Sequence, residues 1–231
     1  MKKYDLVLFD MDGTLLDFEK AERLSMKDTL ADFGFRNDDD VVETYKTINE
    51  SYWKRLELGQ ITEDRLAVER HQALFDRYGF SADVVAFQQC YEGYLRNSSY
   101  LYDAALDVLS TIKARMSCKL AIVTNGFYRI QTNRIALAKL DDYFEHIFIS
   151  EQVGYRKPQI EFFEQVFKAI GGNISKENAL IIGDSLSSDI KGGSDFGIDT
   201  CWFNPLKQTN SLGVRVDYEI QQLDQLKEMI G

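Results

Sequence analysis

Two aspartates, Asp10 and Asp12, follow an apolar run near the start of the chain. Four consecutive apolar residues at 6–9 are typical of a strand that is buried on both faces of a sheet. In an extended segment, side chains two positions apart point to the same side, so both carboxylates could face one small polar site. Gly13 then allows the backbone to turn away. Taken alone, the stretch could also be a solvated turn without chemical function.

Two more apolar runs, residues 120–123 and 179–182, end in small polar turns that contain Thr124 and Asp184. The carboxyl ends of parallel strands meet at one edge of a sheet, and ligands bind there in open α/β folds. We therefore expect one edge to collect carboxylates, a hydroxyl and, from a basic loop, a lysine. The side chains concerned are Asp10, Asp12, Thr124, Lys157 and Asp184.

This set of groups suits phosphoryl transfer, which depends mainly on positioning and on the neutralisation of charge. Aspartate oxygens are hard ligands of the kind that Mg²⁺ prefers, with waters and a substrate phosphate completing an octahedron. Lys157 offers a positive charge to a phosphoryl oxygen, while Thr124 and backbone N–H groups near Asn125 could donate hydrogen bonds to the others. The sequence thus predicts a Mg²⁺ site beside a phosphate-binding site.

A carboxylate can also attack phosphorus, which divides one difficult step into two easier ones. Asp10 suits this role because the metal could hold it beside the phosphorus. Asp12 would then protonate the leaving alcohol and later activate water. To donate a proton near neutral pH, the pKa of Asp12 must rise above its reference value of about 3.9. Neighbouring carboxylates act in that direction and the metal opposes them.

The elements that position these groups are of two kinds. Residues 17–99 carry apolar residues at helical spacing and no convincing strand, which predicts amphipathic helices in a separate all-α unit. From residue 101 onward helices and strands alternate, which calls for a parallel sheet with helices on both faces. The predicted helices lie at 18–33, after 38–40, and at 62–79, 82–95, 104–113, 128–139, 160–170, 189–197 and 223–230, and the predicted strands at 6–9, 120–123, 147–149, 179–182, 200–203 and 218–220.

The composition is that of an ordinary globular protein, with 231 residues of which 45% are hydrophobic and 28% charged. No apolar run approaches the roughly 18 residues of a membrane span, and the first residues lack a cleavage site, so we expect a cytoplasmic protein without membrane partners. The net charge of −10 disfavours a nucleic-acid polymer as partner. Three separated cysteines argue against disulfides or a zinc site, and only two histidines, His71 and His146, are present for a triad.

Four ordered motifs resemble those of the haloacid dehalogenase-like hydrolase superfamily over nearly the whole chain. They are Asp10-Met11-Asp12-Gly13-Thr14, Thr124-Asn125, Lys157-Pro158, and Gly183-Asp184-Ser185 followed by Asp189. The resemblance implies a Rossmann-like α/β core with a parallel sheet at 1–16 and 100–231. It also implies an inserted, mobile all-α cap of type C1 at 17–99, hinged near residues 16–17 and 97–100.

The same resemblance assigns roles to individual residues. Asp10 would be the nucleophile and Asp12 the general acid and base. The Mg²⁺ ligands would be the Asp10 carboxylate, the Asp12 carbonyl and Asp184, with Asp189 supporting them from the same acidic loop. The phosphate-binding residues would be Thr124, Asn125 and Lys157.

The segment 124–127 and the segment 183–193 are similar to those of the YjjG/YfnB-type pyrimidine 5′-nucleotidases. This similarity implies hydrolysis of nucleoside monophosphates such as UMP, dUMP or dTMP. The main partner would then be a small phosphorylated substrate, and both a monomer and a homodimer remain open.

Several other functions use the same motifs. A sugar-phosphate phosphatase or a hexose-phosphate mutase keeps both aspartates, whereas a dehalogenase needs no metal and no acid at Asp12. Phosphonate cleavage would require a lysine from the cap. A non-catalytic binding or regulatory protein on the same fold is the alternative from a different class. The intact Asp10, Asp12, Lys157 and Asp184 argue against it, since a relic would be free to lose some of them.

Overall fold

The computed structural model describes residues 2–115 and 118–230, which form two compact units. The first, here called the sheet unit, comprises Met1–Asp17 and Ser99–Gly231, and the second, the helical unit, comprises Phe18–Ser98. Met1, Gly231 and residues 116–117, which fall within the predicted core range, lie outside the described residues.

The sheet unit contains a six-stranded sheet in the order β3-β2-β1-β4-β5-β6, and every neighbouring pair is parallel. This confirms the predicted α/β class. Phe9 at the end of β1 pairs with Ile122 on one side and Ile182 on the other, so the three central strands end within two residues of one another. The strands are β1 Leu6–Phe9, β2 Lys119–Thr124, β3 His146–Ile149, β4 Ala179–Gly183, β5 Asp199–Phe203 and β6 Tyr218–Ile220.

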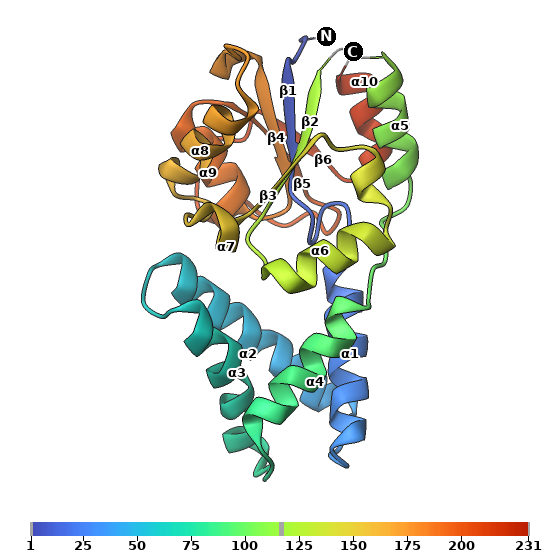
Figure 1. Ribbon diagram of the computed structural model, residues 1–231, viewed down its shortest axis with the longest axis vertical. Helices are drawn as coiled ribbons and strands as arrows, with labels where there is room; N and C mark the ends of the chain where they lie inside the picture. Colours follow the sequence, from blue (N-terminus) through green and yellow to red (C-terminus); the bar gives the residue numbers. More distant parts are fainter. Residues whose placement is uncertain (1, 116–117, 231) are drawn as a thin grey trace. The chain divides into compact units, whose positions relative to one another are not determined.

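Helices cover both faces of the sheet (Figure 1). Val7 and Phe9 of β1 pack in one apolar cluster with α5, α6 and α10, while Leu6 and Leu8 pack in the other with α8 and α9. All four side chains are fully buried, and burial of one such side chain contributes roughly 1.5–3 kcal/mol. The helices are α5 Ala105–Arg115, α6 Tyr128–Leu137, α7 Ser150–Val153, α8 Ile160–Ile170, α9 Lys191–Phe196 and α10 Leu226–Met229.

The helical unit consists of four helices whose ends follow from local sequence. Asp38 caps α2 by accepting a hydrogen bond from the N–H of Val41. Thr62 does the same for α3 through the N–H of Arg65, and Gly79 ends that helix in the left-handed conformation. The starts of these two helices, and the end of α3, lie within one or two residues of the predicted bounds. The helices are α1 Phe18–Asp32, α2 Asp39–Glu57, α3 Glu63–Tyr78 and α4 Val84–Arg96.

A chain of buried polar groups runs through the interior of the helical unit. The Nδ2 atom of Asn49 donates to Glu22 at 2.6 Å, and Arg70 donates to the Oδ1 atom of Asn49 at 2.9 Å. Arg70 and the ring of His71 both contact the side-chain oxygen Oε1 of Gln88, at 3.4 and 2.6 Å. Buried polar groups are costly unless they are hydrogen-bonded, and this network provides partners from all four helices.

The chain passes between the two units at residues 17–18 and 98–99. On the side of the sheet unit, the two crossing segments are tied together. The N–H of Asp17 donates to the carbonyl of Tyr100 at 2.7 Å, and Leu16 forms an antiparallel bridge with Leu101.

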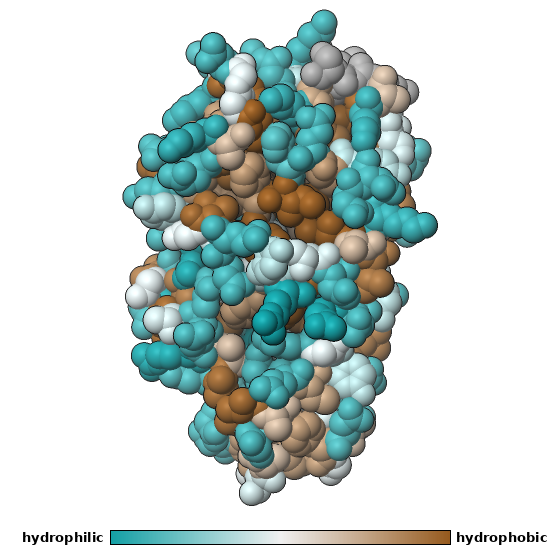
Figure 2. All heavy atoms as spheres, viewed as in Figure 1, coloured by the Kyte–Doolittle hydropathy of each residue, from teal (hydrophilic) through white to brown (hydrophobic). Residues whose placement is uncertain are grey.

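Hydrophilic residues dominate the face drawn in Figure 2, with apolar residues between them. Of the helices in the described part of the chain, none combines the length and the apolar character that a membrane crossing requires.

Candidate active site

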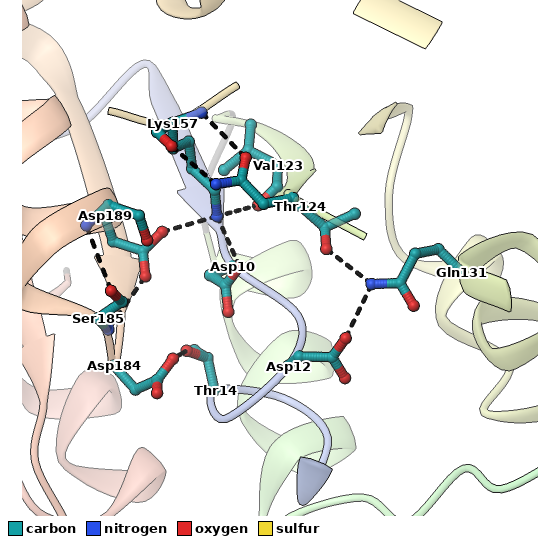
Figure 3. Close-up of polar contacts among 12 residues, drawn as sticks. Asp10, Asp12, Thr14, Val123, Thr124, Gln131, Lys157, Asp184, Ser185 and Asp189 are labelled. Carbon is teal, nitrogen blue, oxygen red and sulfur yellow. Dashed lines mark hydrogen bonds and ion pairs between the residues drawn. The ribbon is translucent and has the colours of Figure 1, made fainter. Parts of the chain in front are cut away.

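Lys157 lies at the centre of the polar edge of the sheet (Figure 3). Its ammonium nitrogen is 2.6 Å from Oδ1 of Asp10 and 2.7 Å from Oδ1 of Asp189, and it donates to the carbonyl of Val123 at 2.7 Å. The lysine side chain is 1% exposed, so these contacts are shielded from water. Burial lowers the pKa of Lys157, but the two carboxylates outweigh this and raise it above its ordinary value. Lys157 is therefore a fixed positive charge.

Three carboxylates surround this charge. Asp10, Asp184 and Asp189 each offer an oxygen, and these oxygens all lie within 4.8 Å of one another. Burial raises the pKa of Asp10 well above its usual range, against the opposing effect of Lys157. Burial, followed by the charge of Asp189, raises the pKa of Asp184 to about 7. With all three ionised, the one ammonium leaves an excess of negative charge that a divalent cation would neutralise.

Asp184 is held from two directions. Its carbonyl accepts a hydrogen bond from the indole N–H of Trp202 at 2.8 Å, and its carboxylate accepts one from the hydroxyl of Thr14 at 3.3 Å. Gly13 adopts a positive φ of 84° beside it, and a Cβ there would lie 2.4 Å from Oδ2 of Asp184. The glycine of the first motif is thus required both by its backbone conformation and by the close approach of this aspartate.

Asp189 lies on a short π-helical turn, Leu186–Ile190, directly after β4. Its second carboxylate oxygen accepts a hydrogen bond from the N–H of Ser185 at 3.1 Å. A Cβ on Gly183 would lie 2.3 Å from Cγ of Asp189, so only glycine leaves room for this side chain. The structure therefore places Asp189 among the predicted site residues, in direct contact with Lys157.

The side chain of Asn125 binds the loop that carries Lys157. Its amide nitrogen donates to the carbonyl of Lys157 at 2.8 Å, and its oxygen accepts from the N–H of Lys157 at 2.9 Å. Both ends of the amide are used in this pair, so the side chain of Asn125 positions the lysine. The phosphate contact expected at Asn125 stays a prediction.

Asp12 does not share its side-chain partners with Asp10. Its Oδ2 accepts a hydrogen bond from Gln131 at 2.8 Å, and its Oδ1 lies 2.6 Å from a guanidinium nitrogen of Arg134. Figure 3 shows the Asp12 carboxylate directed toward Gln131. The two carboxylates have different partners because β1 ends at Phe9 and the following residues turn. That both face one site stays a prediction.

Gln131 and Arg134 were missed by the sequence interpretation. Both are essentially fully buried on α6, at 1% and 0% exposure, one helical turn apart. Polar residues three positions apart, flanked by the apolar Ile130 and Ile135, were the available signal. Gln131 lies four residues after the end of the Thr-Asn-Gly-Phe segment. A polar pair on the apolar face of a helix needs hydrogen-bond partners.

The sequence and the fold are similar to those of known proteins. Residues 4–197 match the family model described as haloacid dehalogenase-like hydrolase. The chain is 39% identical over 231 residues to YfnB of Bacillus subtilis, a haloacid dehalogenase-like (HAD) hydrolase. This alignment covers 100% of this chain and 97% of YfnB. It is 37% identical over 227 residues to the pyrimidine 5′-nucleotidase PynA of Streptococcus pneumoniae, covering 98% of this chain and 95% of PynA. A crystal structure of YfnB bound to magnesium has a TM-score of 0.93 at 38% identity over 100% of both chains.

Proposed function

The chain belongs to the haloacid dehalogenase-like hydrolase family, and we propose that it is a Mg²⁺-dependent phosphatase acting on small phosphate monoesters through an aspartyl-phosphate on Asp10. The observation that carries this proposal is the 2.6 Å contact of Asp10 with Lys157. A carboxylate oxygen of Asp10 also lies within 4.8 Å of oxygens of Asp184 and Asp189. A nucleophile, a fixed cation and acidic oxygen ligands are the parts that phosphoryl transfer needs.

The donor set fits Mg²⁺. Asp10, Asp184 and Asp189 offer only oxygen ligands, which Mg²⁺ prefers. Both oxygens of Asp189 already have partners in Lys157 and Ser185, so we assign the ligands to Asp10, Asp184 and the Asp12 carbonyl. When bound, the ion supplies charge neutralisation on the phosphoryl oxygens.

In the first step, a carboxylate oxygen of Asp10 attacks phosphorus. The new bond joins Asp10 to phosphorus, and the bond from phosphorus to the alcohol oxygen breaks. Asp12 gives its proton to the departing oxygen. The phosphoryl oxygens are held by Lys157 and Thr124. Because the three ammonium hydrogens of Lys157 already have three acceptors, a phosphoryl oxygen would replace one of them.

In the second step, Asp12 takes a proton from water, and the water oxygen attacks the same phosphorus. The bond between phosphorus and Asp10 breaks, so inorganic phosphate leaves and the Asp10 carboxylate is restored. Asp12 ends this step protonated, ready for the next substrate. One carboxyl group thus serves as acid and then as base.

Nucleoside 5′-monophosphates with a pyrimidine base are the proposed substrates. The support is the 37% identity to the pyrimidine 5′-nucleotidase PynA over nearly the whole length of both chains. In this proposal the helical unit is the cap of the family. Sugar phosphates are the competing substrate class, because the core chemistry does not distinguish one alkyl phosphate from another.

A phosphate-release screen with Mg²⁺ tests the proposal. UMP, dUMP and dTMP are compared with AMP, GMP and glucose 6-phosphate, and 4-nitrophenyl phosphate reports the core chemistry. We expect kcat/KM for the pyrimidine nucleotides to exceed that for the purine nucleotides by at least about tenfold, the discrimination that about 1.4 kcal/mol of differential binding supplies. Faster release from glucose 6-phosphate would reject the nucleotide assignment. Release from none of these compounds would reject the phosphatase.

A further inference from the structure

One amide, the side chain of Gln131, joins two groups of the site. Its Nε2 atom donates to Oδ2 of Asp12 at 2.8 Å and to the hydroxyl oxygen of Thr124 at 2.8 Å (Figure 3). An amide nitrogen carries two hydrogens, so these two acceptors use both of them. The carboxylate and the hydroxyl are therefore positioned by the same group.

Arg134 fixes which way this amide faces. Its Nη1 atom donates to Oε1 of Gln131 at 3.2 Å and lies 2.6 Å from Oδ1 of Asp12. A guanidinium has only donors, so the atom of Gln131 that faces it must be the carbonyl oxygen. The amide nitrogen is thereby directed at Asp12 and Thr124. Each carboxylate oxygen of Asp12 has its own cationic or amide partner.

This orientation determines the polarity of the Thr124 hydroxyl. A hydroxyl has one hydrogen to donate, and its oxygen accepts from Gln131. Its own hydrogen is therefore directed at a different acceptor. A phosphate-binding hydroxyl needs this arrangement, because phosphoryl oxygens only accept hydrogen bonds.

The space for the amide depends on Gly126, at the start of the loop that leads into α6. A Cβ at this position would lie 2.3 Å from Nε2 and 2.4 Å from Cδ of Gln131. Both atoms belong to the amide, which is buried and bonded at each end. Gly126 is thus needed for the conformation that places the amide between Asp12 and Thr124.

We propose that Gln131, oriented by Arg134, is a positioning residue. It holds the acid/base carboxylate of Asp12 in place and determines where the hydroxyl hydrogen of Thr124 points. The inference rests on the proposed function, in which Asp12 and Thr124 have these roles. It adds a residue that acts through the two others. Loss of Gln131 should weaken proton donation to the leaving group and phosphate binding together.

Leaving groups of different acidity separate this role from a structural one. 4-Nitrophenolate leaves with little help from an acid, whereas the alkoxide of UMP needs a proton. For Gln131→Met, which keeps the size but no polar atom, we expect kcat/KM on UMP, which reports the first step and not the shared hydrolysis of the aspartyl-phosphate, to fall about 100-fold. We expect kcat/KM on 4-nitrophenyl phosphate to fall less than about tenfold, and inhibition by inorganic phosphate to weaken. Leu137→Ala, an exposed change on the same helix, should alter neither substrate.

A double variant tests whether Gln131 acts through Asp12. In an Asp12→Asn background, Gln131→Met should cause little further loss on UMP, because groups that act as a unit are not additive. If Gln131→Met fails to fold, Gln131→Glu, which keeps the shape and removes the two donors, replaces it. Equal losses on both substrates, or additive losses in the double variant, would overturn the inference. A wild-type protein inactive on both substrates would instead reject the proposed function.

Discussion

Replacing Glu22 by glutamine should change how stability depends on pH. Glu22 is 5% exposed in the helical unit, where its carboxylate accepts a hydrogen bond from Asn49. Burial raises its pKa from an ordinary value of 4.5 to about 7, with a smaller contribution in the same direction from Glu50. The hydrogen bond from Asn49 and the charges of Arg70 and Lys46 oppose the shift.

The sign and size of the effect follow from this shift. Between pH 4.5 and about 7, the unfolded chain has released the proton of Glu22 while the folded protein retains it. The free energy of unfolding therefore decreases as pH rises through this window. At about 1.4 kcal/mol per pKa unit, a shift of this size corresponds to about 3 kcal/mol. Glutamine does not titrate, so the Glu22→Gln variant should lack this decrease.

Urea denaturation followed by circular dichroism, on both sides of the window, measures the effect. His71 is also buried and has a lowered pKa, so it removes stability as pH falls below its ordinary value, in both proteins. The difference between wild type and variant cancels that contribution. Glu164→Gln, an exposed change on α8, is the control and should show no pH-dependent difference. Parallel stability profiles for wild type and Glu22→Gln would contradict the raised pKa of Glu22 in the folded protein.

Two further variants, one control variant and removal of the metal test the site. Lys157→Met should abolish phosphate release and lower the free energy of unfolding by about 3–5 kcal/mol, because Asp10 and Asp189 lose their shared cation; an unchanged denaturation midpoint would argue against the buried ion cluster. Gly183→Ala should cost about 1–3 kcal/mol and most activity, since its Cβ would displace Asp189. Gly93→Ala, where nothing lies within 4 Å, should be neutral or stabilising by up to about 1 kcal/mol, and equal melting shifts for the two glycine variants would contradict the steric explanation. Excess chelator should stop phosphate release and added Mg²⁺ should restore it, whereas activity that persists in chelator would reject the metal assignment.

The arrangement of the polar edge was predictable because it depends on strand ends. Apolar runs at 6–9, 120–123 and 179–182 are typical of strands in the centre of a sheet, and parallel pairing then brings their carboxyl ends to the same edge. Asp10 and Asp184 follow two of these ends, so their proximity needed no further information. The helix ends were also predictable where a cap residue or a glycine is present, as at Thr62.

The partners within the site were not predictable from these patterns. The polar pair Gln131 and Arg134 on the apolar face of α6 indicates that partners are needed, but only the tertiary structure shows that Asp12 lies opposite them. Asn125 follows a strand as predicted, but its side chain serves the main chain of Lys157, 32 residues away in the sequence. Such pairings depend on loop conformation, which hydrophobic spacing does not encode.

Phosphate release from UMP with Mg²⁺, measured side by side for wild type and Asp10→Asn, tests whether Asp10 is the nucleophile. The amide keeps the size of the side chain but is not a nucleophile, so the rate should fall by at least about 10³-fold. Asp141→Asn, an exposed change in the same unit, should retain the wild-type rate. Hydrolysis by Asp10→Asn at a rate close to that of wild type would contradict nucleophilic attack by Asp10.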